Sequence, residues 1–219
     1  MASVQLLSSY HQLIIHSHFY FYGDAASEQL AKQIATDIDQ HWNEPKASIQ
    51  QRGNRYDVVF DIKGFYEPQL QPETVWYNTD TKLFYFRIEE YSPMHVSFVD
   101  GIGSNTGYFK LSNLLQTSTT AAHEYGHMLG LHHPNELDIR GQGIPGIMYP
   151  RGTICDPHYQ YDSAAVAGQT GGTLDPQHRK VQISDIEALQ LHKLRFDAEG
   201  FAVLGDFTSI YHSHYLPAE

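Results

Sequence analysis

The alternation of apolar and polar positions predicts that the first half of the chain forms a sheet with one helix packed on it. Residues 12–22 (QLIIHSHFYFY) are rich in β-branched and aromatic side chains, which is typical of a strand. Over residues 26–42, apolar side chains recur on one face of a predicted helix whose N-cap would be Ser27. These side chains are Leu30, Ile34, Ile38 and Trp42. Strand-like runs follow at 55–62, 74–77, 83–91, 94–100 and 106–111.

The second half begins with a helical pattern that stops at Gly130, a residue type that commonly ends helices. After a loop-like stretch, residues 183–194 (ISDIEALQLHKL) again have a helical pattern. Ser184 would be the N-cap of this helix, and Glu187 would complete a capping box. The residues after it are similar to a short hairpin.

The order of these elements predicts an α+β fold in a single domain. We expect an N-terminal subdomain over about 10–130, with the sheet and the first helices. A C-terminal subdomain would cover about 131–196, and a hairpin or tail about 197–219.

Composition narrows the class of protein without locating a site. The 219 residues are 41% hydrophobic and 18% charged, which suits a globular domain. The net charge of −11 disfavours non-specific nucleic-acid binding, which needs a basic surface. No apolar run is long enough to predict a membrane span, and the N-terminus lacks the basic region of a signal peptide. We therefore expect a cytoplasmic protein, or one exported by a non-classical route, whose oligomeric state the sequence does not indicate.

The 14 histidines, as many as the lysines and arginines together, favour metal chemistry, and the segment 123–133 (HEYGHMLGLHH) locates it. His123 and His127 are one helical turn apart, so both imidazoles project from one side of a helix. Gly130 is able to end the helix and reverse the chain, which brings His133 back as a third ligand. Three protein ligands suit a zinc ion whose fourth position is open to water, which is the catalytic arrangement.

Glu124, next to His123, is the expected general base. It would take a proton from the zinc-bound water as this water attacks a peptide carbonyl, and return the proton to the leaving amine. His132 is an alternative ligand, but the offset from His127 favours His133. Histidines that are merely solvated or packed in a helix are the other interpretation. The positions of Gly130 and His133 disfavour it, because chance rarely adds both to an HExxH pattern.

The same segment resembles the long zinc signature of the metzincin metallopeptidases, HExxHxxGxxH, and GIMYP at 146–150 is similar to the matrixin form of their Met-turn. The order of elements over about 12–196 is also similar to a matrixin catalytic domain. The resemblance implies a metzincin-like zinc-peptidase fold with a five-stranded mixed sheet, packed helices, an active-site helix and a small C-terminal subdomain. It implies that His123, His127 and His133 bind one Zn²⁺, that Glu124 is the base and that Met148 forms a hydrophobic floor.

The chain is most similar to a divergent, minimal matrixin, because no matrixin propeptide or structural-ion segment is recognisable in it. The resemblance implies a zinc-dependent endopeptidase that acts on protein or peptide substrates. Tyr149 and Pro150 would wall the pocket beside the cleaved bond, and Tyr149 is not expected to bind the metal. The alternatives are a non-catalytic zinc-binding interaction module and a protease delivered as a toxin or effector. Glu124 disfavours the interaction module, because a module that only binds needs no base.

Three further features have less specific interpretations. Cys155 is the single cysteine, so no intrachain disulfide forms; its thiolate could block the zinc, although a free, half-buried thiol is favoured. The HSH triplets at 16–18 and 212–214 would build a second metal site only if their strands were neighbours. Carboxylates at three loop positions could bind calcium, but their spacing matches no known calcium loop. These positions are Asp156, Asp162 and Asp175.

Overall fold

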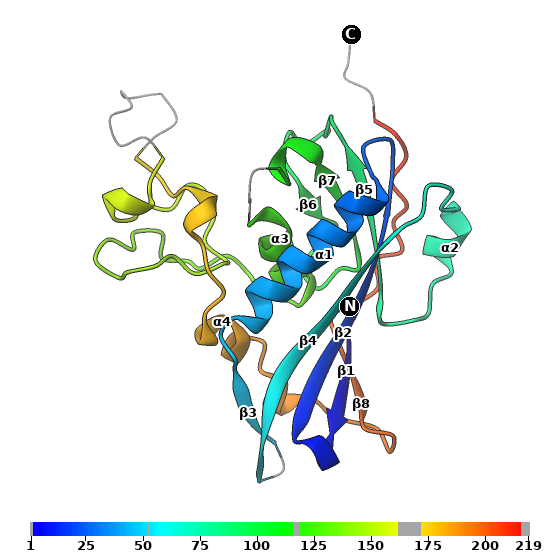
Figure 1. Cartoon of the computed structure of the whole chain (residues 1–219), viewed down its shortest axis with the longest axis vertical. Helices are drawn as coiled ribbons and strands as arrows, with labels where there is room; N and C mark the ends of the chain where they lie inside the picture. Colours follow the sequence, from blue (N-terminus) through cyan, green and yellow to red (C-terminus); the bar gives the residue numbers. More distant parts are fainter. Residues whose placement is uncertain (1, 52, 116–118, 162–171, 216–219) are drawn as a thin grey trace.

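One curled, mixed sheet organises the chain in the computed structural model, which describes residues 2–51, 53–115, 119–161 and 172–215 (Figure 1). Its eight strands are β1 (Ala2–Leu7), β2 (Gln12–Tyr22), β3 (Ser48–Gln51), β4 (Asn54–Tyr66), β5 (Leu83–Glu89), β6 (Phe98–Val99), β7 (Thr106–Lys110) and β8 (Phe201–Leu204). The helices are α1 (Glu28–Asn43), α2 (Pro72–Trp76), α3 (Thr120–Met128) and α4 (Ile183–Ala188). Short 3₁₀ turns are η1 (Ser8–Tyr10), η2 (Leu111–Asn113), η3 (Pro157–Tyr159), η4 (Pro176–His178) and η5 (Leu191–Lys193).

The long strand β2 lies at the centre and makes the sheet fork. One edge of β2 pairs in parallel with β4 along almost its full length, with Ile14 opposite Val59. The other edge pairs first with β1, antiparallel, and then with β5, in parallel from His18 onward. One branch continues to β8 and the other to β7 and β6, so the expected count of five strands is wrong. The count was too low because β3 was not predicted and because β1 and β8, from opposite ends of the sequence, join the same sheet.

Helix α1 packs on the sheet as the apolar periodicity predicts. The Ser27 hydroxyl accepts a hydrogen bond from the amide of Leu30, so Ser27 is the predicted N-cap. The predicted apolar face is buried, and Gly64 in β4 lets the helix approach closely because a Cβ there would collide with the carbonyl of Ala31. At the end of α1, Trp42 Nε1 donates to the carbonyl of Ala122 at 3.0 Å, which ties α1 to α3.

Several local predictions are wrong, each for a physical reason. Residues 74–77 lie mostly in helix α2, which begins at Pro72, a residue suited to a first helical turn. Of residues 94–100, only Phe98–Val99 form a strand, because residues 92–95 form a turn in which His95 has left-handed backbone geometry (φ 61°). The predicted helix over 183–194 ends early, because Gln190 has left-handed backbone geometry (φ 52°).

The cap of α4 and the C-terminal hairpin also differ from the predictions. The capping box consists of Gln182 and Asp185, not of Ser184 and Glu187, because the N-cap lies two residues earlier than predicted. No hairpin forms in the described part of the C-terminal region, since β8 pairs with β1 instead. In the described ranges, no helix is long and apolar enough to cross a membrane.

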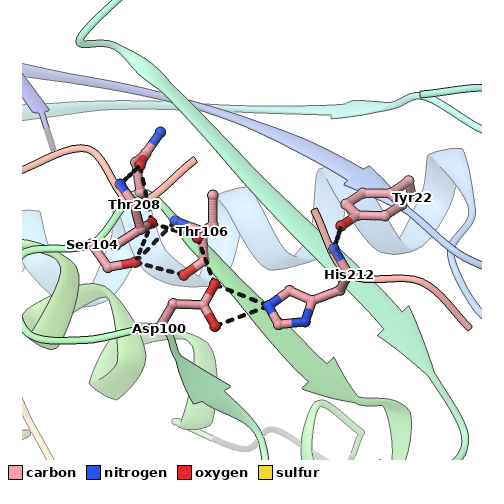
Figure 2. Close-up of polar contacts among 7 residues, drawn as sticks. Tyr22, Asp100, Ser104, Thr106, Thr208 and His212 are labelled. Carbon is pink, nitrogen blue, oxygen red and sulfur yellow. Dashed lines mark hydrogen bonds and ion pairs between the residues drawn. The ribbon is translucent and has the colours of Figure 1, made fainter. Parts of the chain in front are cut away.

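The segment after β8, residues 205–215, has no regular secondary structure but is fixed to the sheet by polar contacts (Figure 2). Nε2 of His212 lies 2.9 Å from both carboxylate oxygens of Asp100. The backbone amide of His212 donates to the Tyr22 hydroxyl at 3.0 Å. Closer to β8 in the same segment, the hydroxyl of Thr208 lies 2.5 Å from the hydroxyl of Thr106. These buried contacts replace the strand pairing that this segment lacks.

The same segment also reaches helix α3 through one glycine. The amide of Asp206 donates to the carbonyl of Gly103 at 2.7 Å. The amide of Gly103 in turn donates to the carbonyl of His127 at 2.7 Å, at the C-terminal end of α3. The position of the helix that carries the predicted ligands therefore depends in part on the C-terminal segment.

Replacing His212 by Ala is expected to lower the free energy of unfolding by about 1–3 kcal/mol, because the buried carboxylate of Asp100 loses a partner. Chemical denaturation of the two proteins measures the difference. His214→Ala is the matched control, since the His214 side chain is 39% exposed and should change stability by less than about 0.5 kcal/mol. Equal losses in the two variants would show that the buried contact is not what matters.

Candidate metal centre

Helix α3 is short, and its surroundings hold it in place. It has nine residues, fewer than an isolated helix needs to be stable in water. Tyr125 is fully buried, and its hydroxyl lies 2.8 Å from that of Ser17 in β2. Ring contacts of Tyr125 with Trp42 and Phe19 bring α1 and the sheet against the helix. The sequence thus places this helix by packing more than by helix propensity.

Gly126 lies where the helix approaches the loop that contains Met148. A Cβ at this position would collide with Sδ of Met148 and lie 3.3 Å from the Trp42 ring. The Met148 side chain is buried, at 3% exposure, against the middle of the helix. The predicted Met-turn residue is therefore packed beneath the turn between His123 and His127.

Gly126→Ala is expected to lower the free energy of unfolding by about 1–3 kcal/mol, because an extra methyl overpacks a filled space. Thermal and chemical denaturation measure this loss. If the collision with Met148 is the cause, the double variant Gly126→Ala with Met148→Ala should lose less stability than the sum of the losses in the two single variants. If the two losses simply added, the strain in Gly126→Ala would come from contacts other than Met148.

Three imidazole nitrogens converge at the end of α3. Nε2 of His133 lies 3.1 Å from Nε2 of His123 and 3.1 Å from Nε2 of His127. Gly130 has a φ of +104°, and this left-handed geometry turns the chain so that His133 returns to the helix. The ring positions therefore depend on the glycine that the sequence singled out.

The hydrogen bonds of the other ring nitrogens fix the tautomers. Nδ1 of His123 lies 2.7 Å from the carbonyl of Ile147, and Nδ1 of His127 lies 2.7 Å from the carbonyl of Leu131. A carbonyl oxygen only accepts, so both Nδ1 atoms carry a proton and both Nε2 atoms of the neutral rings present lone pairs. The Nε2–H group of His133 is able to donate to only one of these two Nε2 atoms, so at least one lone pair stays without a donor from the three rings.

A cation among these three nitrogens would satisfy all of the lone pairs. Tetrahedral zinc with bonds of about 2.0–2.1 Å separates its ligand nitrogens by about 3.3 Å, close to the observed 3.1 Å. Histidine ligands of metals commonly donate their second ring N–H to a carbonyl, as His123 and His127 do. The donor set therefore fits a zinc ion.

The electrostatics keep these histidines neutral, as a metal ligand must be. Burial lowers the pKa of His127 to about 4 and holds the pKa of His123 well below its usual range. Burial lowers the pKa of His133 as well, and the positive charge of Arg179 adds to the effect for His123 and His133. All three rings are therefore ready to bind a cation at neutral pH.

Glu124 lines a pocket of about 240 Å³, which His123 and His133 also line. Burial raises the pKa of Glu124 to about 8 in the metal-free chain, and the charge of Arg179 opposes this shift. A dication held by the histidines would also lower the pKa, because it favours the carboxylate. A carboxyl group whose pKa lies near neutrality is suited to accept and return a proton.

The structure places the remaining predicted residues as follows. Pro150 lines the pocket, but Tyr149 does not; its ring packs against the buried cluster of Ile139, Cys155 and Leu174. The buried Cys155 therefore does not border the candidate metal centre, which removes the basis for a blocking thiolate. Burial also raises the pKa of this thiol.

The two HSH triplets do not form a second metal site. His16 lies in β2 with Nδ1 2.8 Å from Asp61, whereas His212 binds Asp100 outside any strand. The predicted neighbouring strands do not exist in the described ranges, because β8 ends before 212–214.

Two of the three candidate calcium ligands make hydrogen bonds to nearby backbone amides, and the third lies outside the described residues. Asp156 accepts from the amide of Gly141 at 2.9 Å, and Asp175 caps a 3₁₀ turn. Asp162 lies outside the described residues.

Arg179 is the residue at this site that sequence reasoning missed. It lines the pocket, is only 5% exposed and follows the short turn η4. No motif surrounds it, and only tertiary structure brings it to Glu124. The nearest signal in the sequence is its place in a stretch between Met148 and the final helix, where no role could be read.

Comparisons with known proteins give no match: no family model matches the chain, and neither does any curated protein. Function has to be inferred from the residues of the site and their geometry.

Proposed function

We propose that the protein is a zinc-dependent endopeptidase of the metzincin type, in which His123, His127 and His133 hold the zinc. The observation that carries the proposal is the convergence of three Nε2 atoms beside a buried carboxyl group. Zinc, when bound, supplies a Lewis acid that polarises a peptide carbonyl and makes water more acidic. The open pocket beside His123, His133 and Glu124 is where a peptide bond would have access.

Glu124 moves the protons of the reaction. Its carboxylate takes a proton from the water that attacks the scissile carbonyl, and returns this proton to the amine that leaves. Its burial raises its proton affinity. Arg179 favours the carboxylate form between turnovers.

The carbonyls of Ile147 and Leu131 orient the rings of His123 and His127. Met148 supports the helix at Gly126, between the two histidines. All three contacts come from outside α3, so the loop over 146–149 and the turn after Gly130 hold the ligands in place. The fold as a whole is α+β, and its metzincin character is part of this proposal.

The proposal is tested by measuring the metal content of the purified chain together with its cleavage of casein, with and without a chelator. One zinc per chain and cleavage that the chelator abolishes would support an endopeptidase. Zinc without cleavage of casein or of a peptide library would favour the alternative of a zinc-binding interaction module. Absence of zinc after reconstitution would refute the assignment of the three histidines.

A further inference from the structure

Arg179 is a buried cation without an ion-pair partner among the described residues. Its side chain is held by neutral oxygens: Nε donates to the Thr119 hydroxyl at 2.9 Å, and Nη1 donates to the carbonyl of Tyr149 at 3.1 Å. Two carboxylates, those of Glu124 and Asp175, influence it only from beyond ion-pair distance. Burying a cation without an anion costs several kcal/mol, so this arrangement needs an explanation.

Arg87 shows how the same protein treats another buried arginine. Its side chain is 8% exposed, and its Nη2 lies 2.6 Å from the carboxylate of Glu89, which is itself buried. Arg87 therefore has a carboxylate in contact, whereas Arg179 has a cavity beside it. The contrast indicates that the anion for Arg179 comes from outside the chain.

Other charges around the pocket favour an anion as well. Arg151 lies at the same pocket and is exposed, with its guanidinium over the ring of Tyr161. A zinc ion on three neutral histidines would add two positive charges, against the negative charge of Glu124, the one acidic side chain among the described residues that line the pocket. The pocket is thus positive in a protein with a net charge of −11, and a local field of this kind selects ligands by charge.

We infer that Arg179, with Arg151, makes this pocket a carboxylate-binding subsite, so that the enzyme prefers substrates with an acidic group beside the cleaved bond. The inference rests on the proposed function and specifies its substrate class. Nη2 of Arg179, which no described residue occupies, and the exposed head of Arg151 are the donors for the carboxylate. Asn113 and Ser97, which also line the pocket, add polar walls around it. The carboxylate belongs either to an Asp or Glu side chain or to the C-terminus of a peptide.

Binding of hydroxamate peptides to the zinc-loaded chain, measured by calorimetry, tests the inference without turnover. Two probes carry Asp or Asn at the residue next to the hydroxamate, and a second pair carries a free or an amidated C-terminus at that position. Because a charged hydrogen bond is stronger than a neutral one, the Asp probe should bind about 10- to 100-fold more tightly than the Asn probe. A preference confined to the free C-terminus would identify the chain end as the source of the carboxylate. Equal affinities within both pairs, or no binding of any probe, would overturn the inference.

Variants of the two arginines identify the donors. Arg179→Gln should reduce the preference for Asp over Asn to less than about threefold. Because Arg179 also holds Thr119 and Tyr149, the exposed Arg151→Glu serves as a second variant that leaves those contacts intact. It should weaken the same preference several-fold. Arg140 is exposed and paired with Asp138, so Arg140→Gln is the control for the loss of a positive charge. It should leave the preference for Asp over Asn unchanged. An unchanged preference in both Arg179→Gln and Arg151→Glu would overturn the inference.

Failure of the inference is distinguishable from failure of the proposed function. An endopeptidase that cleaves casein but shows no acidic preference in binding or in a peptide library would retain the function and lose the subsite. A chain that binds the Asp probe preferentially but cleaves nothing would retain the subsite and lose the function.

Discussion

Replacing Glu124 by Gln is expected to lower kcat for peptide cleavage by about 10²–10⁴-fold while the chain keeps its zinc. Glutamine has almost the same shape but does not accept and return a proton. None of the three imidazoles changes, so the metal content should stay the same. Burial penalises the carboxylate of Glu124, so the variant should be at least as stable as the wild type. Turnover of a fluorogenic peptide, zinc content and thermal unfolding measure the three quantities.

Glu136→Gln is the matched control, because Glu136 is exposed in the loop after the candidate ligands and does not line the pocket. Its kcat should remain within about twofold of the wild type. Undiminished cleavage by the Glu124 variant would refute the proposed role of this residue as the base. Loss of zinc from that variant would show that Glu124 acts on the metal site and not only on the proton.

Replacing His133 by Ala is expected to weaken zinc binding by more than about 100-fold and to abolish cleavage. Loss of a residue that only supports a ligand already costs about 10- to 100-fold, and His133 is a proposed ligand itself. The side chain is exposed, so the metal-free variant should be as stable as the metal-free wild type. The increase in Tm that zinc gives to the wild type should therefore be lost from the variant.

The neighbouring His132→Ala supplies the control, since His132 is also exposed but does not belong to the group of converging nitrogens. It should bind zinc and cleave peptides as the wild type does. If instead His132→Ala lost zinc binding and His133→Ala kept it, His132 would be the third ligand. If both bound zinc normally, the metal would lie elsewhere.

The candidate site was largely predictable because its candidate ligands are close in sequence. Helical spacing brings His123 and His127 together, and the left-handed Gly130 returns the chain to them. Arg179 was not predictable, because its approach to Glu124 depends on how the chain folds after Met148. The same holds for the carbonyl of Ile147, which carries no side-chain signal in the sequence.

The central strands and the first helix followed from local patterns, whereas the extent of the sheet did not. The periodicity around β2 and α1 is strong, and both elements lie where it predicts. The pairing of β1 with β8 joins the two ends of the described chain, and local periodicity says nothing about such pairing. Helix α2 was predicted as a strand because its few residues fit either period.

The three candidate ligands all lie between residues 123 and 133, whereas the carbonyl that orients His123 comes from Ile147 and the positive charge beside the site from Arg179. During synthesis, the ligand segment leaves the ribosome before either of these residues. Closing so short a loop around a metal costs little conformational entropy, so zinc could be captured by a chain that is still incomplete. Catalysis would have to wait for the rest of the fold, and loading with metal and acquisition of activity would be separate events in the maturation of the protein.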